Sequence, residues 1–176
     1  MQNREWKYIK SRAVLWAALL FFVLGVAGVG IGLLPTPFSP AATVEAAMRR
    51  ETLTIETQSG RQVFEIEVAE SPDEKAKGLM FRAKIPDGTG MLFPYGAPQE
   101  ITMWMKNTYA SLDMVFIRGD GIVHRIETNT EPMSERVIAS GGPVTAVLEL
   151  AAGAAAKFGI KAGDRIIHKE FPAKPN

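Results

Sequence analysis

The alternation of apolar and polar positions after residue 50 predicts a domain built mainly of short strands. Thr52–Thr57 and Gln62–Val68 alternate with a period of two and are joined by a short turn sequence, so they predict a β-hairpin. Leu112–Arg118 and Ile122–Thr128 have the same character, and Gly119-Asp120-Gly121 between them is a strong turn signal. The chain therefore contains two predicted hairpins separated by more than forty residues.

Four further segments complete the predicted strands, which are Gly90–Tyr95, Glu100–Asn107, Thr145–Leu150 and Asp164–Phe171. Pro94 has no N–H to donate to a neighbouring strand, so we expect its strand to lie at an edge or to end there. We expect Glu100–Asn107 to be a separate strand, because its apolar and polar side chains also alternate.

Two short helices are predicted from local signals. Ser71-Pro72-Asp73-Glu74 has the spacing of a capping box, with proline at the first helical position, so a helix should run from Pro72 to about Lys77. A second should lie within Ala151–Phe158 and end at Gly159. Strands and helices together predict a mostly β fold, a single compact antiparallel β sandwich or barrel with two short helices.

The N-terminal region has a different character. Ala13–Leu34 is an uncharged apolar run of 22 residues, and a helix of that length spans about 33 Å, enough to cross a bilayer. Four basic side chains and one acidic side chain precede it. The positive-inside rule then places the N-terminus in the cytoplasm and everything after Leu34 outside the membrane.

The sequence leaves open whether this segment is removed. Its length favours a permanent membrane anchor, whereas the prolines that follow and the small-residue site at Val44–Ala46 are compatible with a cleaved signal peptide. We therefore expect a signal peptide or anchor over residues 1–34, a linker over 35–50 and a β-rich domain over 51–176. The expected location is the periplasm or the outer face of the cytoplasmic membrane.

Composition excludes several function classes. Residues 51–176 carry 14 basic and 17 acidic side chains, a net charge of −3, and show no basic stripe of the kind that binds nucleic acid. Cysteine is absent, which excludes disulfides, thiolate zinc sites and cysteine nucleophiles. The two histidines, His124 and His168, lack the spacing of a metal site. We expect no metal, no cofactor and no nucleic-acid partner.

The candidate ligand-binding residues are the polar and aromatic positions that interrupt apolar segments: Arg82, Trp104, Lys106, Asn107, Asp113 and Glu149. Charges inside apolar strands are costly unless they are paired. These side chains either pair with one another to stabilise the fold, or line a small polar pocket with Trp104 as one wall. On the second interpretation, the protein binds a small polar or saccharide-like molecule.

Two alternative functions remain open. Asp113 and Glu149 are candidates for the acid and base of a hydrolase, provided that their carboxyl groups lie within reach of one substrate. Met103 and Met105 are spaced to share one face of a strand, and thioethers are ligands that favour Cu(I). Methionine is also a common core residue, and the methionines here stand among leucine and phenylalanine.

Five short motifs resemble a known family. They are Gly78–Arg82 (GLMFR), Gly90–Phe93 (GMLF), Trp104–Thr108 (WMKNT), Leu112–Ile117 (LDMVFI) and Val147–Leu150 (VLEL). In this order they are similar to the bacterial and archaeal domain-of-unknown-function family 192, over a match from about Leu53 to Phe171. All six candidate residues belong to these motifs.

The resemblance implies a jelly-roll-like β domain of a kind often exported behind a signal peptide. It implies no activity, since the family is named for the lack of one, and no catalytic residue follows from it.

Overall fold

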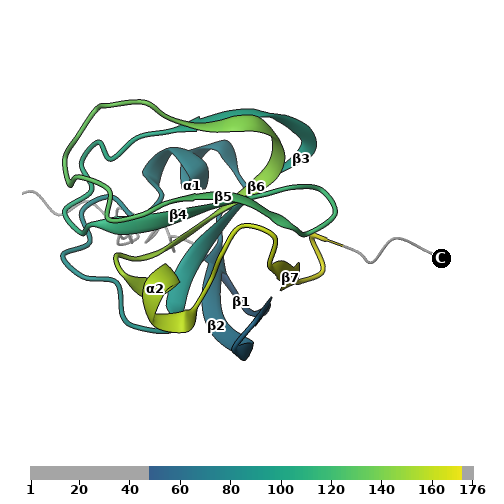
Figure 1. Cartoon of the computed structure of the whole chain (residues 1–176). Helices are drawn as coiled ribbons and strands as arrows, with labels where there is room; N and C mark the ends of the chain where they lie inside the picture. Colours follow the sequence, from purple (N-terminus) through teal and green to yellow (C-terminus); the bar gives the residue numbers. More distant parts are fainter. Residues whose placement is uncertain (1–47, 172–176) are drawn as a thin grey trace, which may run out of the picture. The chain divides into compact units, whose positions relative to one another are not determined.

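The protein is described here by a computed structural model over residues 48–171. Seven strands and two short helices form along this stretch (Figure 1). In chain order they are β1 (Arg49–Thr57), β2 (Gly60–Val68), α1 (Pro72–Lys77), β3 (Thr89–Met103), β4 (Leu112–Ile117), β5 (Val123–Glu127), β6 (Ile138–Ala151), α2 (Ala154–Phe158) and β7 (Arg165–Ile167).

No helix within residues 48–171 is long and apolar enough to cross a membrane. The segment Ala13–Leu34, and with it the expected signal peptide or anchor, lies outside the described residues.

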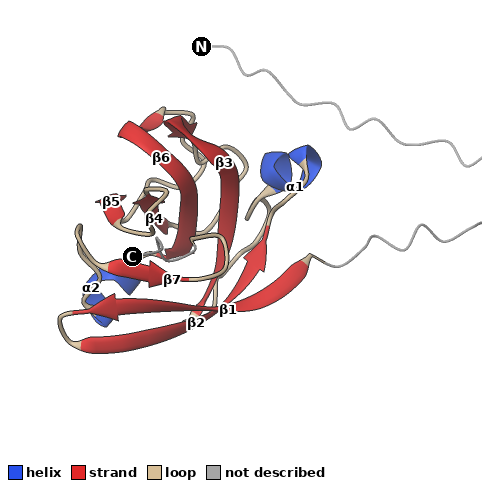
Figure 2. Cartoon of the chain, turned by 90° about the vertical axis from the view of Figure 1, so that its right-hand side faces the viewer, coloured by secondary structure: helices blue, strands red, loops and turns tan. Residues whose placement is uncertain are grey.

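All seven strands belong to one sheet with the order β5-β4-β6-β3-β2-β1-β7. The sheet curls into a half-barrel, as Figure 2 shows, with β4 and β5 on one side and β1, β2 and β7 on the other. The two edges meet through backbone hydrogen bonds: Ile166 N–H donates to Gly121 O over 2.7 Å, and Val123 N–H donates to Asp164 O over 2.9 Å. A bridge between Ile122 and Arg165 continues this contact.

The mostly β class and the two short helices are confirmed, and the finer architecture differs from the expectation. The strands form a single curled sheet, and β2 and β3 pair in parallel between Glu65–Val68 and Thr89–Leu92. A parallel pair needs a long connection, and here residues 69–88, which include α1, provide it.

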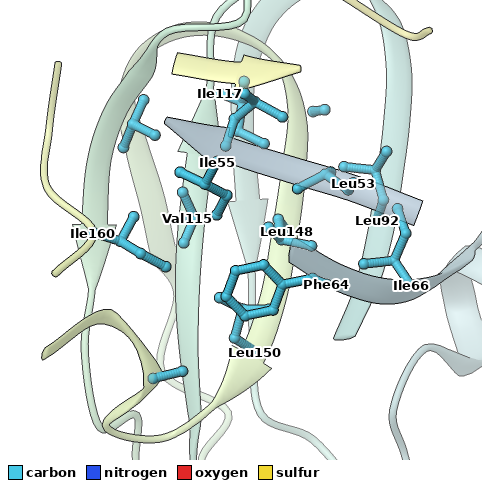
Figure 3. Packing of buried hydrophobic residues seen from close by; sticks show 14 of the residues in the cluster. Leu53, Ile55, Phe64, Ile66, Leu92, Val115, Ile117, Leu148, Leu150 and Ile160 are labelled. Carbon is cyan, nitrogen blue, oxygen red and sulfur yellow. The ribbon is translucent and has the colours of Figure 1, made fainter. Parts of the chain in front are cut away.

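The inner face of the curl holds one apolar core. Strand side chains alternate between the two faces of a sheet, so every second residue of β1, β2, β4 and β6 points inward. Figure 3 shows Ile55, Phe64, Val115 and Leu148 pointing toward one another between the strands. Leu150 and Ile160 extend this core toward α2 (Figure 3).

A second apolar core lies on the outer face of the same sheet. Met91 and Phe93 of β3 and Met114 of β4 point outward and pack under Leu79 and Met105, which come from the segments after α1 and after β3. Both faces of the middle strands are therefore covered by apolar side chains and shielded from solvent. Strand β4 is buried along its whole length. A polar side chain on either face of these strands is removed from water.

The predicted hairpins β1–β2 and β4–β5 are confirmed. Helix α1 has the predicted bounds, and its capping box is complete: Ser71 Oγ accepts the Glu74 N–H, and Glu74 Oε2 accepts the Ser71 N–H. Helix α2 begins at Ala154, three residues after the start of its predicted segment. Strand β7 is shorter than predicted, and β6 begins at Ile138, in a region assigned no element.

The prediction for β3 was wrong in two respects. Gly90–Tyr95 and the start of Glu100–Asn107 form one strand, whose register shifts between Pro94 and Gln99. Pro94 is tolerated because pairing with β2 ends at Leu92, so β3 has only β6 beside it at that point. The strand ends at Met103, which leaves Trp104–Asn107 in a loop.

Candidate functional site

Two loops lie side by side over the outer face of the sheet, one following α1 and one following β3. The Phe81 N–H donates to Asn107 O over 2.8 Å, and Asn107 Nδ2 lies 3.9 Å from Met80 Sδ. Phe81 and Asn107 both have positive φ, 64° and 54°. Asparagine adopts this conformation readily, whereas for a bulky residue such as phenylalanine it is strained. Asn107 therefore joins the two loops through its backbone.

The two loops, α1 and the sheet enclose a small pocket. Its volume is about 40 Å³, enough for a water molecule or one small polar group. The lining residues are Lys75, Ala76, Lys77, Gly78, Leu79, Met80, Phe93, Met103, Trp104, Thr108 and Glu149. A wider hollow of about 270 Å³ adjoins it and is lined by Thr102, Met103, Trp104 and Val137. Met103 and Trp104 line both hollows, and we refer to the two hollows together as the Trp104–Glu149 site.

Glu149 is the buried polar group of this site. It alternates in β6 with the inward Leu148 and Leu150, so its side chain points to the outer face, where it is only 4% exposed. None of the hydrogen bonds or ion pairs within residues 48–171 involves its carboxyl group. Burial raises the pKa of Glu149 to about 8, so the carboxyl is protonated at neutral pH. A buried ionisable group with a shifted pKa in a pocket is a typical functional-site candidate.

Aromatic rings and lysines surround the opening of the pocket. Trp104 is 50% exposed, and the Lys106 ammonium lies 5.3 Å from the centre of its indole ring. The Lys75 ammonium lies 5.0 Å from the centre of the Tyr95 ring. Burial, and secondarily the nearby Glu149 carboxyl, raise the pKa of Tyr95. The site thus combines a half-exposed indole ring, the Lys75 side chain and a buried acid, with the Lys106 ammonium over the ring.

Asp113 lies apart from this site, on the inner face of β4. It is fully buried; one carboxylate oxygen accepts the Asn129 N–H over 2.9 Å and the other accepts the Ala155 N–H over 2.8 Å. Both oxygens are therefore occupied by the backbone of flanking segments, and the side chain fixes the start of α2 against β4. Glu149 points to the opposite face, so the two carboxyls that the hydrolase alternative needs do not share a pocket.

Arg82 also points away from the Trp104–Glu149 site. Its guanidinium forms two hydrogen bonds with the Glu67 carboxylate, of 3.1 and 2.6 Å. The hydrogen bonds from Arg82 are the main cause that lowers the pKa of Glu67. This pair lines a separate hollow of about 250 Å³ beside β2. Of the six candidate residues, the structure brings together Trp104, Lys106, Asn107 and Glu149, and it separates Arg82 and Asp113 from them.

Three of the methionine sulfurs have hydrogen-bonding neighbours within the described structure. Met80 Sδ accepts from Asn107 Nδ2, Met103 Sδ accepts from Tyr95 Oη over 3.6 Å, and Met105 Sδ lies 3.1 Å from Thr130 Oγ1. Each sulfur has its own polar neighbour. Within residues 48–171 there is also no group of three or more histidine and acidic side chains placed to hold a metal ion.

Sequence reasoning missed Lys75, Met80 and Tyr95 as parts of this site. Lys75 was interpreted only as a residue of a short helix, although its position one turn before Gly78 places it beside the GLMFR motif. Tyr95 is the last residue of the predicted strand Gly90–Tyr95, two positions after the GMLF motif, where its hydroxyl was a usable signal. Met80 belongs to the motif itself and was considered only as a core residue or copper ligand.

The fold and the site together define a class: a small half-barrel β domain whose outer face carries a pocket with a buried acid. The chain belongs to the domain-of-unknown-function family 192, described as uncharacterized ACR, whose model matches residues 54–168. The matched stretch contains α1, β3 and β6, and hence every residue of the Trp104–Glu149 site.

Two solved structures are similar to this chain. A candidate transcription regulator from Sinorhizobium meliloti 1021 is 39% identical, with a TM-score of 0.69 over 72% of this chain and 98% of its own. A protein of unknown function from Novosphingobium aromaticivorans DSM 12444 is 39% identical, with a TM-score of 0.68 over 74% of this chain and 93% of its own. No curated protein matches the chain.

The crystallised chains of both relatives consist almost entirely of the matching domain. In this chain residues 44–176 form one compact unit, and we use a fragment over these residues for the experiments below.

Proposed function

We propose that this domain binds a small polar, saccharide-like molecule at the Trp104–Glu149 site. The observation that carries the proposal is that a half-exposed indole ring and a buried carboxyl without a hydrogen-bond partner among the described residues line the same pocket. An aromatic face suits the flat apolar side of a sugar ring, and a few polar groups at its end fix the orientation of a ligand.

The two hollows differ in size, so each fits a different part of the proposed ligand. The inner pocket of about 40 Å³ holds one hydroxyl or a group of similar size beside Glu149. The outer hollow of about 270 Å³ leaves room for a ring against Trp104. A protonated carboxyl both donates and accepts a hydrogen bond, so Glu149 is matched to a hydroxyl or another oxygen group.

Location outside the cytoplasmic membrane is the second part of the proposal. It rests on the apolar run Ala13–Leu34 and the basic residues before it. A reporter enzyme that is active only after export, fused to the C-terminus of the full chain, should be active, and deletion of residues 13–34 should abolish that activity.

A binding screen tests the ligand site. The fragment 44–176 contains Trp104 as its sole tryptophan, so a ligand that stacks on this ring should change the intrinsic fluorescence. Thermal unfolding should be measured in parallel against neutral, acidic and amino sugars. A ligand present at about 100 times its dissociation constant adds about 2.7 kcal/mol of stability.

A pair of variants separates specific binding from general stabilisation. Trp104→Ala should abolish the ligand-dependent shift in melting temperature, whereas Val63→Ala, an exposed apolar residue on β2 that lines none of the three hollows described, should retain it. The proposal fails if no sugar stabilises the protein, or if both variants respond to ligand in the same way.

A further inference from the structure

The charges around the pocket restrict the kind of ligand. Lys75 and Lys77 of α1 line the pocket, and the Lys106 ammonium lies over the Trp104 ring at its entrance. The Lys106 ammonium also lies 3.7 Å from Glu135. That pair is exposed to solvent, at 44% and 68% of the two side chains, so it is weak and readily exchanged for a stronger partner. Lys75 and Lys106 thus supply positive charge close to the pocket.

Glu149 does not offset these cations, because it is buried beneath them in the protonated state. Lys75 and Lys77 of α1 line the same pocket as Glu149, and Lys106 lies over the Trp104 ring. Burial raises the pKa of Tyr95 of β3, and the Glu149 carboxyl lies close enough to raise it further. The residues opposite Glu149 on the neighbouring strands, Met91 and Met114, carry no charge. Burial is the cause that raises the pKa of Glu149. Its O–H is thus available as a donor to a molecule in the pocket that Lys75 also lines.

We propose that the ligand is acidic: a sugar-like molecule with a carboxylate or phosphate group that contacts Lys75 and Lys106 and accepts a hydrogen bond from the Glu149 carboxyl. This inference rests on the proposed ligand-binding function and narrows its ligand class. A carboxylic acid kept neutral by an apolar environment is an effective donor to an oxyanion, and lysine ammonium groups add favourable charge. An amino sugar would face repulsion from these cations, while Glu149 would have to ionise to accept it.

Four probes with nearly the same ring test the inference on the fragment 44–176: glucose, glucuronate, glucose 6-phosphate and glucosamine. At about pH 6.5, where Glu149 is protonated, calorimetric titration should give glucuronate or the phosphate an affinity on the order of tenfold above that of glucose, the gain typical of one charge-assisted hydrogen bond. Glucosamine should bind no better than glucose. Glucuronate and glucose 6-phosphate distinguish a carboxylate from a phosphate ligand.

The pH dependence tests the role of Glu149 directly. Glucuronate should bind about tenfold more weakly at about pH 9, because Glu149 then carries a negative charge that faces the ligand. In Glu149→Gln the amide still donates a hydrogen bond, so binding should be retained and should not change over this pH range. Glu149→Leu should lose the gain for acidic probes at both pH values.

A lysine pair provides the matched control. Lys75→Ala should reduce the affinity for glucuronate by a larger factor than the affinity for glucose. Lys161→Ala, an exposed lysine that lines none of the three hollows described, should change neither. Equal affinity for glucose and both acidic probes overturns the inference and leaves ligand binding intact. Absence of binding by all four probes overturns the inference together with the proposed function.

Discussion

Two buried acids of this domain, Asp113 and Glu149, differ in the hydrogen bonds that their carboxyl groups form. Asp113 accepts two backbone N–H groups and is thereby a structural residue, whereas Glu149 has no comparable hydrogen bonds within the described chain. Burial of an acid without partners lowers the stability of the folded state at neutral pH, since the unfolded chain can ionise it freely. Retaining Glu149 in β6 costs stability that an amide or leucine would not cost, as expected of a functional residue.

The stability of the protein should therefore fall as pH rises from about 4.5 to about 8. In this range the folded protein keeps the proton on Glu149 and the unfolded chain loses it. The loss from this group reaches about 3 kcal/mol by pH 7. In Glu149→Gln the difference between unfolding free energies at low and neutral pH should shrink by that amount, as measured by urea denaturation.

Glu135→Gln, which removes an exposed carboxylate, should leave this difference unchanged. Equal pH profiles of stability for wild type and Glu149→Gln would contradict the raised pKa of Glu149.

Sequence reasoning selected Asp113 and Glu149 for the same reason, an acid within an apolar strand, and could not separate them. Strand alternation shows that Glu149 faces away from Leu148 and Leu150, but in a half-buried strand that face is normally solvated. The segments 78–82 and 104–109 cover it, and their proximity is a tertiary contact between parts of the chain about 25 residues apart. No local pattern encodes this contact, so the burial of Glu149 could not be predicted.

At the level of elements, the predictions succeeded where the signal was local. The two hairpins and α1 depend on turn residues and caps within a few positions, and all three were predicted. The parallel pairing of β2 with β3 and the continuity of β3 through Pro94 depend on strands distant in sequence. Pro94 indicated a strand edge, and this holds only for the part of β3 around Pro94, because the pairing of β3 with β2 ends two residues earlier, at Leu92.

Close contact between β3 and β6 depends on Gly90. A Cβ atom at this position would lie 2.5 Å from Glu149 O and 2.7 Å from Leu150 Cδ2, so the strands cannot keep their register around a larger residue. Gly90→Ala should destabilise the domain by about 3 kcal/mol or prevent folding, as measured by chemical denaturation and by recovery of soluble protein. Gly96→Ala is the control: φ is +77° there but the space is open, so we expect a loss of about 1 kcal/mol. Similar losses in the two variants would show that the strand contact is looser than described.

At the scale of the whole molecule, the curl of the sheet explains why a chain this short has two apolar cores. The inner core is enclosed by the curl, and the outer core is covered in part by Leu79 and Met105 from the loops after α1 and β3. The inner pocket of the Trp104–Glu149 site is a hollow between these covering segments and the outer face of the sheet. The strand pattern predicted a mostly β domain, but the closure of the curl depends on contacts between the segments 121–123 and 164–166, which the sequence does not reveal.

Closure of the half-barrel depends on the short strand β7. Ile166 is buried in the inner core, is paired with Ile55 of β1, and donates its N–H to Gly121 O beside β5, so it links the two edges of the sheet. Ile166→Ala leaves the backbone bond in place and removes the side chain that holds β7 against the core. The variant should lose about 3 kcal/mol of unfolding free energy.

The neighbouring Ile167 supplies the control, because it lies in the same three-residue strand and is 44% exposed. Ile167→Ala should cost less than about 1 kcal/mol. Hydrogen exchange of the Val123 and Ile166 amides should accelerate together in Ile166→Ala, since both amides bond across the seam between the edges. If the two alanine variants lose equal stability, or if only the Ile166 amide loses protection, closure of the half-barrel does not depend on β7.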